Sequence, residues 1–219
     1  LGSEVARACA RAGAQVILLG RKLPRLNRLY DSIVQDGGQA VLYPLDLSGA
    51  SPDDYATLAE RIGDELGALH GIVHAAAEFP GLTPLSHAKP MDLALAVHVN
   101  LTAPCWLTQA CLPLLRQSAD ASVVLAVDDP ARVGQAYWGG YGIAQHGLRA
   151  MVGMLSTELA GTTVRVAGLQ PVDVDGRGGR GLHGVGAGAG RLVAGQGFQF
   201  FLHAQRIAVV EGDLVLHRD

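Results

Sequence analysis

A phenol and an amide stand at a spacing that bears on proton transfer. Tyr141 and Gln145 are four residues apart in a helix-like segment, so their side chains share one helix face. A tyrosine titrates at about pH 10, and it exchanges its proton near neutrality only beside a positive charge. Gln145 carries no charge, and no lysine follows Lys89 in the chain. These residue types therefore predict poor acid/base catalysis at Tyr141.

Two cations follow the first apolar segment of the chain. Arg21 and Lys22 come directly after Gly20, which ends the strand-like segment Ala14–Leu19. A guanidinium beside an ammonium suits a phosphate group, because both make charge-assisted hydrogen bonds and the guanidinium binds through two parallel ones. This interpretation predicts a phosphate-bearing ligand at the end of the strand. The alternative is a pair of solvated loop charges.

Histidine and cysteine spacings give no pattern typical of a metal site. Of the eight histidines only His70 and His74 are four apart, and they fall at the two ends of a predicted strand rather than on one helix face. Three cysteines without a C-x-x-C pair suit a reducing compartment and small buried thiols. We therefore expect no metal, no disulfide and a cytoplasmic location.

Length and composition narrow the class of protein. The 219 residues, 49% of them apolar, predict a single globular domain over residues 1–219. A formal net charge of -3 argues against nucleic acid and against an anionic membrane surface as partners. The sequence also contains no run of about 18 apolar residues and no basic-then-apolar leader.

Helix-like and strand-like segments alternate along the chain. Apolar strands separated by helices predict a doubly wound parallel α/β sheet that is buried on both faces, of either dinucleotide-binding or flavodoxin type. The predicted helices are Gly2–Ala12, Pro24–Gln35, Ser51–Gly67, Ala88–Leu115, Trp138–Leu159 and Gln199–Arg206, and the predicted strands are Ala14–Leu19, Ala40–Tyr43, Leu69–Ala75, Ser122–Val127, Thr163–Leu169 and Leu214–Leu216.

The first element is a helix, whereas a dinucleotide-binding sheet has its first strand at the centre. A sheet without that strand would leave its second and fourth strands unpaired. We therefore expect a strand and a glycine loop before Leu1, with Gly2 at the end of a loop that cradles a pyrophosphate. An ordinary helix start is the alternative.

Five short pieces, in this order and spacing, resemble the short-chain dehydrogenase/reductase family up to about Pro171. They are Gly20-Arg21-Lys22, Leu45-Asp46-Leu47, His74-Ala75-Ala76-Ala77, Val99-Asn100-Leu101 and Tyr141. The resemblance implies a Rossmann-type sheet that passes a hydride between a nicotinamide cofactor and a small carbonyl or alcohol substrate. It also implies a homodimer or homotetramer that packs through the Ala88–Leu115 and Trp138–Leu159 helices.

The resemblance implies a catalytic tetrad with two changed members. Tyr141 is the implied general acid/base and Asn100 the implied member of the proton relay, although Asn100 could instead be a polar residue that bends the helix. The family's serine and lysine positions hold Asp128 and Gln145, and Asp128 could also be a plain exit from its strand. Catalysis is then weak or lost. Two alternatives remain. The first is a noncatalytic subunit that senses nucleotide or interacts with a partner, and the second is an active reductase in which Tyr141 has another partner.

The resemblance also implies cofactor contacts. Because no acid ends the strand before Arg21, NADP(H) is expected over NAD(H). The implied contacts are Gly2, Arg21, Lys22, Asp46, Ala75, Gln145 and Pro171. Ala75 to Ala77 depart from the family's Asn-Ala-Gly, and Asp46 could instead begin the next helix. The glycine-rich stretch 172–197 takes the position of the substrate lid and is expected to be a mobile loop.

Overall fold

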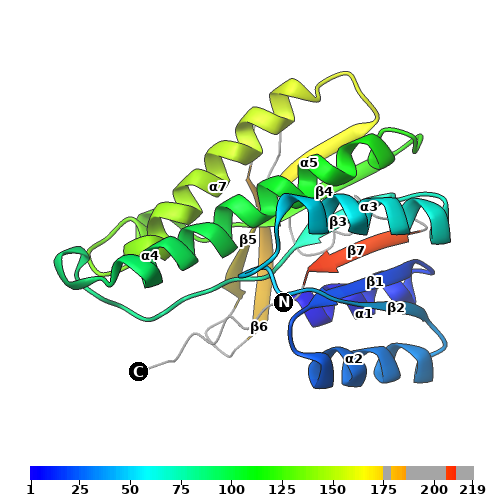
Figure 1. Cartoon of the computed structure of the whole chain (residues 1–219), viewed down its shortest axis with the longest axis horizontal. Coiled ribbons are helices and arrows are strands. Elements are labelled where there is room, and N and C mark those ends of the chain that lie inside the picture. The colour runs from blue at the N-terminus through cyan, green and yellow to red at the C-terminus, as the bar shows by residue number, and fades with distance from the viewer. Residues whose placement is uncertain (175–178, 186–205, 211–219) are drawn as a thin grey trace.

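The computed structural model describes residues 1–174, 179–185 and 206–210. They form one sheet with the strand order β2-β1-β7-β3-β4-β5-β6 and helices on both faces (Figure 1). Among the described strands, β6 is antiparallel to β5 and every other pairing is parallel. The prediction of a doubly wound α/β fold is confirmed.

Most elements lie where the sequence predicts them. The strands are β1 (Gln15–Gly20), β2 (Gln39–Pro44), β3 (Gly71–His74), β4 (Ala121–Ala126), β5 (Val164–Val174), β6 (Gly179–Val185) and β7 (Arg206–Val210). The helices are α1 (Gly2–Arg11), α2 (Leu23–Gln35), α3 (Pro52–Leu66), η1 (Leu85–His87), α4 (Pro90–Val97), η2 (His98–Thr102), α5 (Ala103–Leu115), α6 (Pro130–Val133) and α7 (Gly139–Glu158). None of the described helices is long and apolar enough to cross a membrane.

Helix α3 shows how local sequence sets the bounds of an element. The Ser51 hydroxyl accepts a hydrogen bond from the Asp54 N–H, and the Asp54 carboxylate accepts one from the Ser51 N–H at 2.7 Å. The helix ends at Leu66 and is capped by Gly67, which has a φ of 75° that a side chain would disfavour. These two ends fix α3 between β2 and β3.

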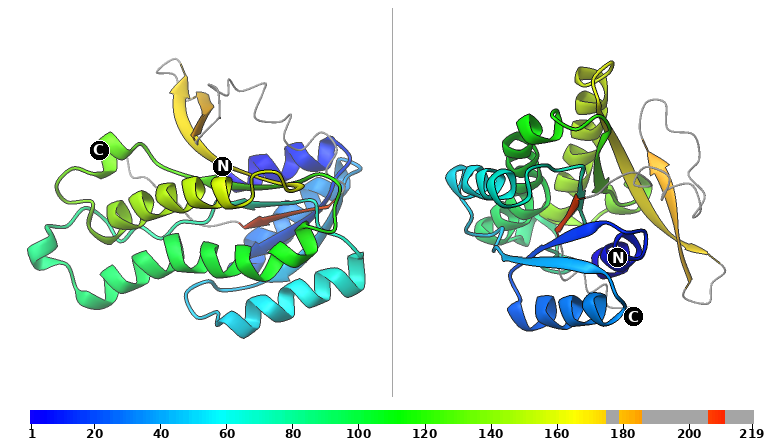
Figure 2. Two further views of the ribbon diagram at one scale, coloured as in Figure 1. Left: turned by 90° about the horizontal axis from the view of Figure 1, so that it is seen from above. Right: turned by 90° about the vertical axis from the view of Figure 1, so that its right-hand side faces the viewer.

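Two apolar clusters hold the sheet between its helices. One cluster joins the sheet to α1 and α2, and the other joins it to α3, α5 and α7. Figure 2 shows the two helix layers on opposite sides of the strands. Burial on both faces explains why the strands are apolar runs rather than alternating patterns.

No central strand of the described sheet is unpaired. β7 lies between β1 and β3 and pairs in parallel with both. Its residues Ile207 to Val210 are fully buried and mostly β-branched, which suits a central strand. The predicted strand Leu214–Leu216 lies outside the described residues, and so does the predicted helix Gln199–Arg206 except for Arg206, which begins β7.

The predicted helix Ala88–Leu115 is interrupted. Its middle, η2, is a π-helical turn between α4 and α5. Within this turn the Asn100 Nδ2 donates to the Ala96 carbonyl at 2.7 Å and to the Glu78 carbonyl at 2.7 Å. The Asn100 side chain thus hydrogen-bonds to main-chain carbonyls at the point where the helix widens into a π-helical turn.

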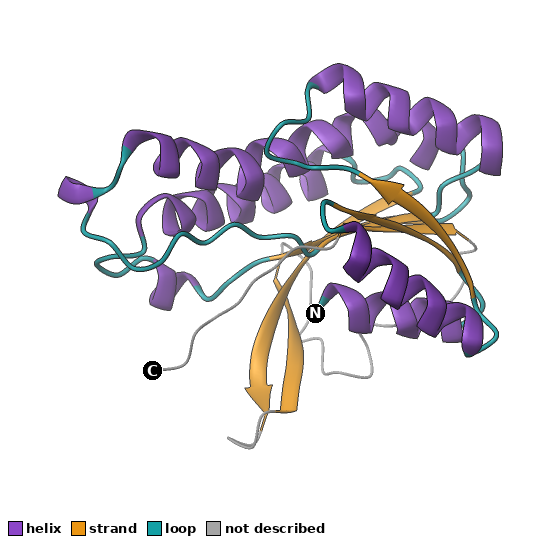
Figure 3. Cartoon of the chain, turned by 60° about the horizontal axis from the view of Figure 1, so that its bottom comes forward, coloured by secondary structure: helices purple, strands orange, loops and turns teal. Residues whose placement is uncertain are grey.

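Part of the predicted loop 172–197 is strand. β5 continues to Val174 and pairs with β6 (Figure 3). Val172 lies opposite Gly181, and Asp173 lies opposite Arg180. Main-chain pairing needs no side chain, which allows a glycine-rich segment to join the sheet. The remainder of the stretch lies outside the described residues, and its mobility stays a prediction.

Candidate functional site

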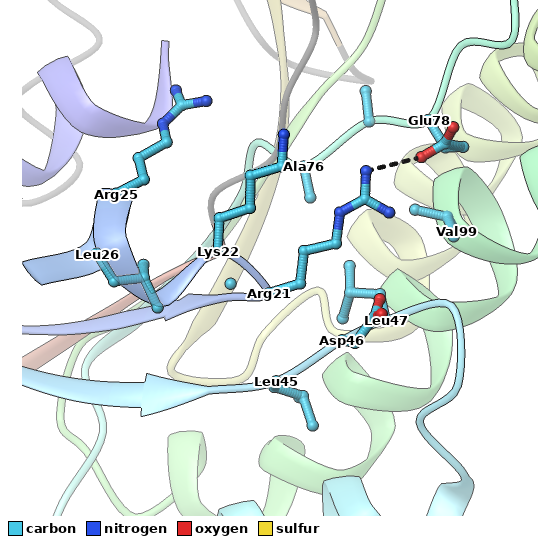
Figure 4. A pocket seen from close by; sticks show the side chains of 12 residues that line it. Arg21, Lys22, Arg25, Leu26, Leu45, Asp46, Leu47, Ala76, Glu78 and Val99 are labelled. Atoms are coloured by element: carbon cyan, nitrogen blue, oxygen red, sulfur yellow. Dashed lines mark hydrogen bonds and ion pairs between the residues drawn. The ribbon is translucent and has the colours of Figure 1, made fainter.

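A hollow lies at the carboxyl ends of β1, β2 and β3, the usual place for a ligand in an open parallel sheet (Figure 4). Arg21 and Lys22 follow β1, Asp46 follows β2, and Glu78 follows β3 by a short loop. The full lining is Gly20, Arg21, Lys22, Arg25, Leu26, Leu45, Asp46, Leu47, Ala76, Ala77, Glu78 and Val99.

The hollow brings together three predicted contacts, namely Arg21, Lys22 and Asp46. The sequence does not single out Arg25 or Glu78, which also line it. Arg25 lies three residues after Lys22, one helical turn away, so helical spacing could have found it. No comparable signal exists for Glu78, because it comes from a separate element.

The Asp46 side chain has a local partner. Its Oδ1 accepts from the Ser48 N–H at 3.0 Å and from the Ser48 hydroxyl at 2.8 Å. The helix that follows is capped by Ser51 instead. Asp46 is therefore not the cap of α3, and its carboxylate lies in the wall of the hollow.

Other predicted contacts lie outside this lining. The Ala75 N–H donates to the Val210 carbonyl, and its neighbours Ala76 and Ala77 line the hollow in its place. Gly2 is buried at the start of α1, and Pro171 lies on β5. Gln145 lies in α7, at a second group of polar residues.

That second group surrounds Asp128, just past β4. The Tyr141 hydroxyl donates to the Asp128 Oδ2 at 3.0 Å. The other oxygen, Oδ1, accepts from the Asp129 N–H at 2.7 Å and from the Arg132 guanidinium. Arg132 is not singled out by the sequence, although its place four residues after Asp128 allows the ion pair.

Gln145 completes the group without contributing a charge. Its Oε1 accepts from the Asp128 N–H at 2.9 Å, and only 6% of the residue is exposed. The Gln145 amide thus fixes the backbone at Asp128. The structure brings Tyr141, Asp128 and Gln145 together.

The surroundings keep Tyr141 protonated. Burial raises the pKa of the Tyr141 phenol most, and the charge and hydrogen bond of Asp128 raise it further, while Arg132 acts in the opposite direction. The net result is a pKa well above the ordinary value of 10.0. The phenol stays protonated, so it is a poor general base. Its proton is already donated to the Asp128 carboxylate, so it is also a poor proton donor to a substrate.

Aromatic rings bury this phenol. The Phe79 ring centroid lies 5.3 Å from that of Tyr141 and 5.4 Å from that of Trp138. The Arg132 guanidinium lies 5.5 Å from the centre of the Trp138 ring. Apolar contacts therefore account for the desolvation of Tyr141.

Asn100 acts on the loop after β3. Its Oδ1 accepts from the Glu78 N–H at 3.0 Å, and its Nδ2 donates to the Glu78 carbonyl at 2.7 Å. The residue is 2% exposed. Asn100 therefore holds the main chain of Glu78 beside the hollow.

His74 belongs to the core. It is buried at the end of β3, and its Nε2 lies 2.9 Å from the Thr108 hydroxyl. Burial lowers its pKa from 6.5 to about 3, so the ring is neutral at physiological pH. Within the described part of the chain, no three His, Cys, Asp or Glu side chains are grouped to hold a metal ion.

Comparison with known proteins gives a consistent result. The family model described as short chain dehydrogenase matches residues 1–180. The chain is 34% identical over 159 residues to the uncharacterized oxidoreductase YciK of Escherichia coli K12, and 30% identical over 177 residues to a short chain dehydrogenase of Pseudocercospora fijiensis. These matches cover 72% and 80% of this chain, but the chain spans only 63% and 56% of the two relatives.

Solved structures agree with these matches. A short chain dehydrogenase of E. coli CFT073, complexed with NADPH, superposes with a TM-score of 0.74 at 34% identity over 78% of this chain and 71% of that one. One from Shigella flexneri, complexed with NADP, gives 0.73 at 32% identity over 77% and 70%. Sequence, fold and site position together show that this chain belongs to the short chain dehydrogenase family.

Proposed function

We propose that this chain binds NADP(H), with the adenosine end of the cofactor in the hollow beyond β1. Arg21, Lys22 and Arg25 place three cationic side chains around one opening, which suits the 2′-phosphate. Asp46 and the small residues Ala76 and Ala77 complete the wall. Relatives complexed with NADP and NADPH support the same choice.

The proposed reaction is carbonyl reduction or alcohol oxidation, weak or lost in this chain. A bound nicotinamide would supply or accept the hydride. The protein would have to move the proton. The observation that carries the proposal of weak or lost catalysis is the hydrogen bond from the Tyr141 hydroxyl to the Asp128 carboxylate. A carboxylate there also opposes the negative charge that develops on a carbonyl oxygen during reduction.

A noncatalytic subunit that senses nucleotide or binds a partner is the second candidate. The closed set of hydrogen bonds among Tyr141, Asp128 and Gln145 favours it, because each group has a partner inside the protein. Arg132 favours residual activity instead, since its charge lowers the pKa of Tyr141. We further propose a small carbonyl or alcohol substrate, a homodimer or homotetramer, and a cytoplasmic location.

The first test is a titration of NADPH and NADH fluorescence with the protein. Arg21→Ala should weaken NADPH binding by about 1.5–3 kcal/mol, the range for a hydrogen bond to a charged group, and leave NADH nearly unchanged. Arg28→Ala is the matched control, because Arg28 is exposed on α2 and does not line the hollow. Equal losses for both cofactors would show that Arg21 does not contact the 2′-phosphate.

A further inference from the structure

The hollow contains an ion pair that the proposed function does not use. The Glu78 Oε2 lies 3.4 Å from the Arg21 Nη2 (Figure 4). The two residues come from different elements, the end of β1 and the loop after β3, and both line the opening. The pair therefore joins two walls of the site.

The backbone on the Glu78 side is fixed. Asn100 bonds both the N–H and the carbonyl of Glu78, and Asn100 itself is buried. The Glu78 side chain is 24% exposed and that of Arg21 is 42% exposed. The carboxylate is thus anchored at its base while its end remains accessible to a ligand.

Glu78 differs from the other acid of the hollow. Asp46 accepts two hydrogen bonds from Ser48, whereas the Glu78 carboxylate faces the guanidinium of Arg21. A phosphate that binds Arg21 must compete with Glu78 and meets a like charge. A ribose hydroxyl can instead donate to the carboxylate. Glu78 thus favours a hydroxyl, whereas Arg21 favours a phosphate.

We propose that Glu78 is a specificity-determining residue that reduces the preference of the hollow for a 2′-phosphate by pairing with Arg21. This inference rests on the proposed nucleotide function. The sequence places no acid at the end of β1, where this family discriminates between cofactors, so Glu78 supplies an acid from the loop after β3. Asn100 is then a positioning residue for that carboxylate.

The test compares adenosine 2′,5′-bisphosphate with adenosine 5′-monophosphate by calorimetry at low salt. Glu78→Gln removes the charge but keeps the size and the backbone bonds to Asn100. It should tighten binding of the bisphosphate by about two- to fivefold, the range for an exposed ion pair, and leave the monophosphate unchanged or weaker. In an Arg21→Ala background the same substitution should have a smaller effect.

Glu65→Gln is the matched control for net charge. Glu65 is exposed in the last turn of α3, pairs with Arg61 and does not line the hollow. An equal gain from this variant, or equal bisphosphate affinity in the parent and Glu78→Gln, would overturn the proposal for Glu78 alone. If neither nucleotide binds the parent or Glu78→Gln, both this proposal and the proposed function are overturned.

Discussion

Asp128 and Gln145 place a carboxylate and an uncharged amide around Tyr141. Tyr141 lies on α7, and its hydroxyl donates to Asp128, just past β4, at 3.0 Å. A lysine one turn along α7 would favour the phenolate, whereas Gln145 only accepts a bond from the Asp128 backbone. The side chains that surround the Tyr141 hydroxyl on α7 and after β4 thus stabilise the neutral phenol rather than the phenolate.

A hydroxyl at position 128 and an ammonium at position 145 should therefore favour proton transfer by Tyr141. Asp128→Ser with Gln145→Lys should raise NADPH-dependent turnover of a ketone panel by roughly tenfold or more over either single variant, because both changes act on one developing charge. The single variants are the controls. A double variant that binds NADPH yet turns over no faster than the parent would show that these positions do not form the reaction centre.

His74 predicts a specific loss of stability in acid. Its pKa is about 3 in the folded protein and 6.5 as a free side chain, so between these values the unfolded state binds the extra proton. The free energy of unfolding should then fall by about 1.4 kcal/mol for each pH unit below the free value. Denaturant unfolding at about pH 7 and about pH 5 measures the slope.

His74→Gln is the reference for this measurement, because its amide can still bond the Thr108 hydroxyl but does not titrate in this range. The parent should lose about 2 kcal/mol more than the variant between the two pH values. Equal losses would mean that His74 is accessible to protons in the folded state.

Individual site residues differ in how far the sequence reveals them. Tyr141 and Gln145 share a helix, so their spacing alone predicts their proximity. Arg21 and Glu78 are 57 positions apart and meet only because β1 and β3 end at the same sheet edge. The proximity of such a pair depends on the order of the strands in the sheet, which the local pattern of apolar residues does not encode.

At the scale of elements, α6 packs on α7 through a glycine. A Cβ built on Gly142 would lie 2.2 Å from the Val133 carbonyl oxygen, which is backbone and cannot move aside cheaply. This contact sets the distance between α6, which carries Arg132, and α7, which carries Tyr141. Gly142 therefore supports the geometry around Asp128.

Gly142→Ala should destabilise the protein by about 1–3 kcal/mol, the usual cost of overpacking, measured by denaturant unfolding. Gly153→Ala in the same helix is the control, since a Cβ there meets nothing within 4 Å. Removing a glycine from an open helix position should stabilise by about 0.5–1 kcal/mol. A Gly142→Ala variant that is as stable as the parent, or more stable, would contradict the packing of α6 on α7.

The elements themselves are largely predictable, and their exceptions have physical causes. The Ser51 cap and the apolar strand runs mark α3, β1 and β4 directly. The π-helical turn η2 escapes detection because its apolar residues keep a helical spacing. β7 is not among the predicted strands, although it is an apolar run, and its pairing with β1 and β3 shows that it is central.

At the scale of the whole molecule, α7 presents an apolar surface opposite its buried face. Ile143 is 50% exposed and Met154 58% exposed. They are eleven residues apart, three helical turns, so they share one side of the helix with the exposed Ala150 between them. An exposed apolar strip of this kind fits the proposed homodimer or homotetramer.

Charging this face should separate the subunits. Ile143→Glu with Met154→Glu should shift the protein toward monomer in sedimentation velocity, because association would then bury unpaired carboxylates. Val34→Glu is the control, since Val34 is 45% exposed on α2 and lies away from α7. A parent that sediments as a monomer at every concentration, or a control with the same effect, would contradict association through this face. Because Tyr141 and Gln145 lie on the opposite face of α7, the double variant should keep its affinity for NADPH while it dissociates.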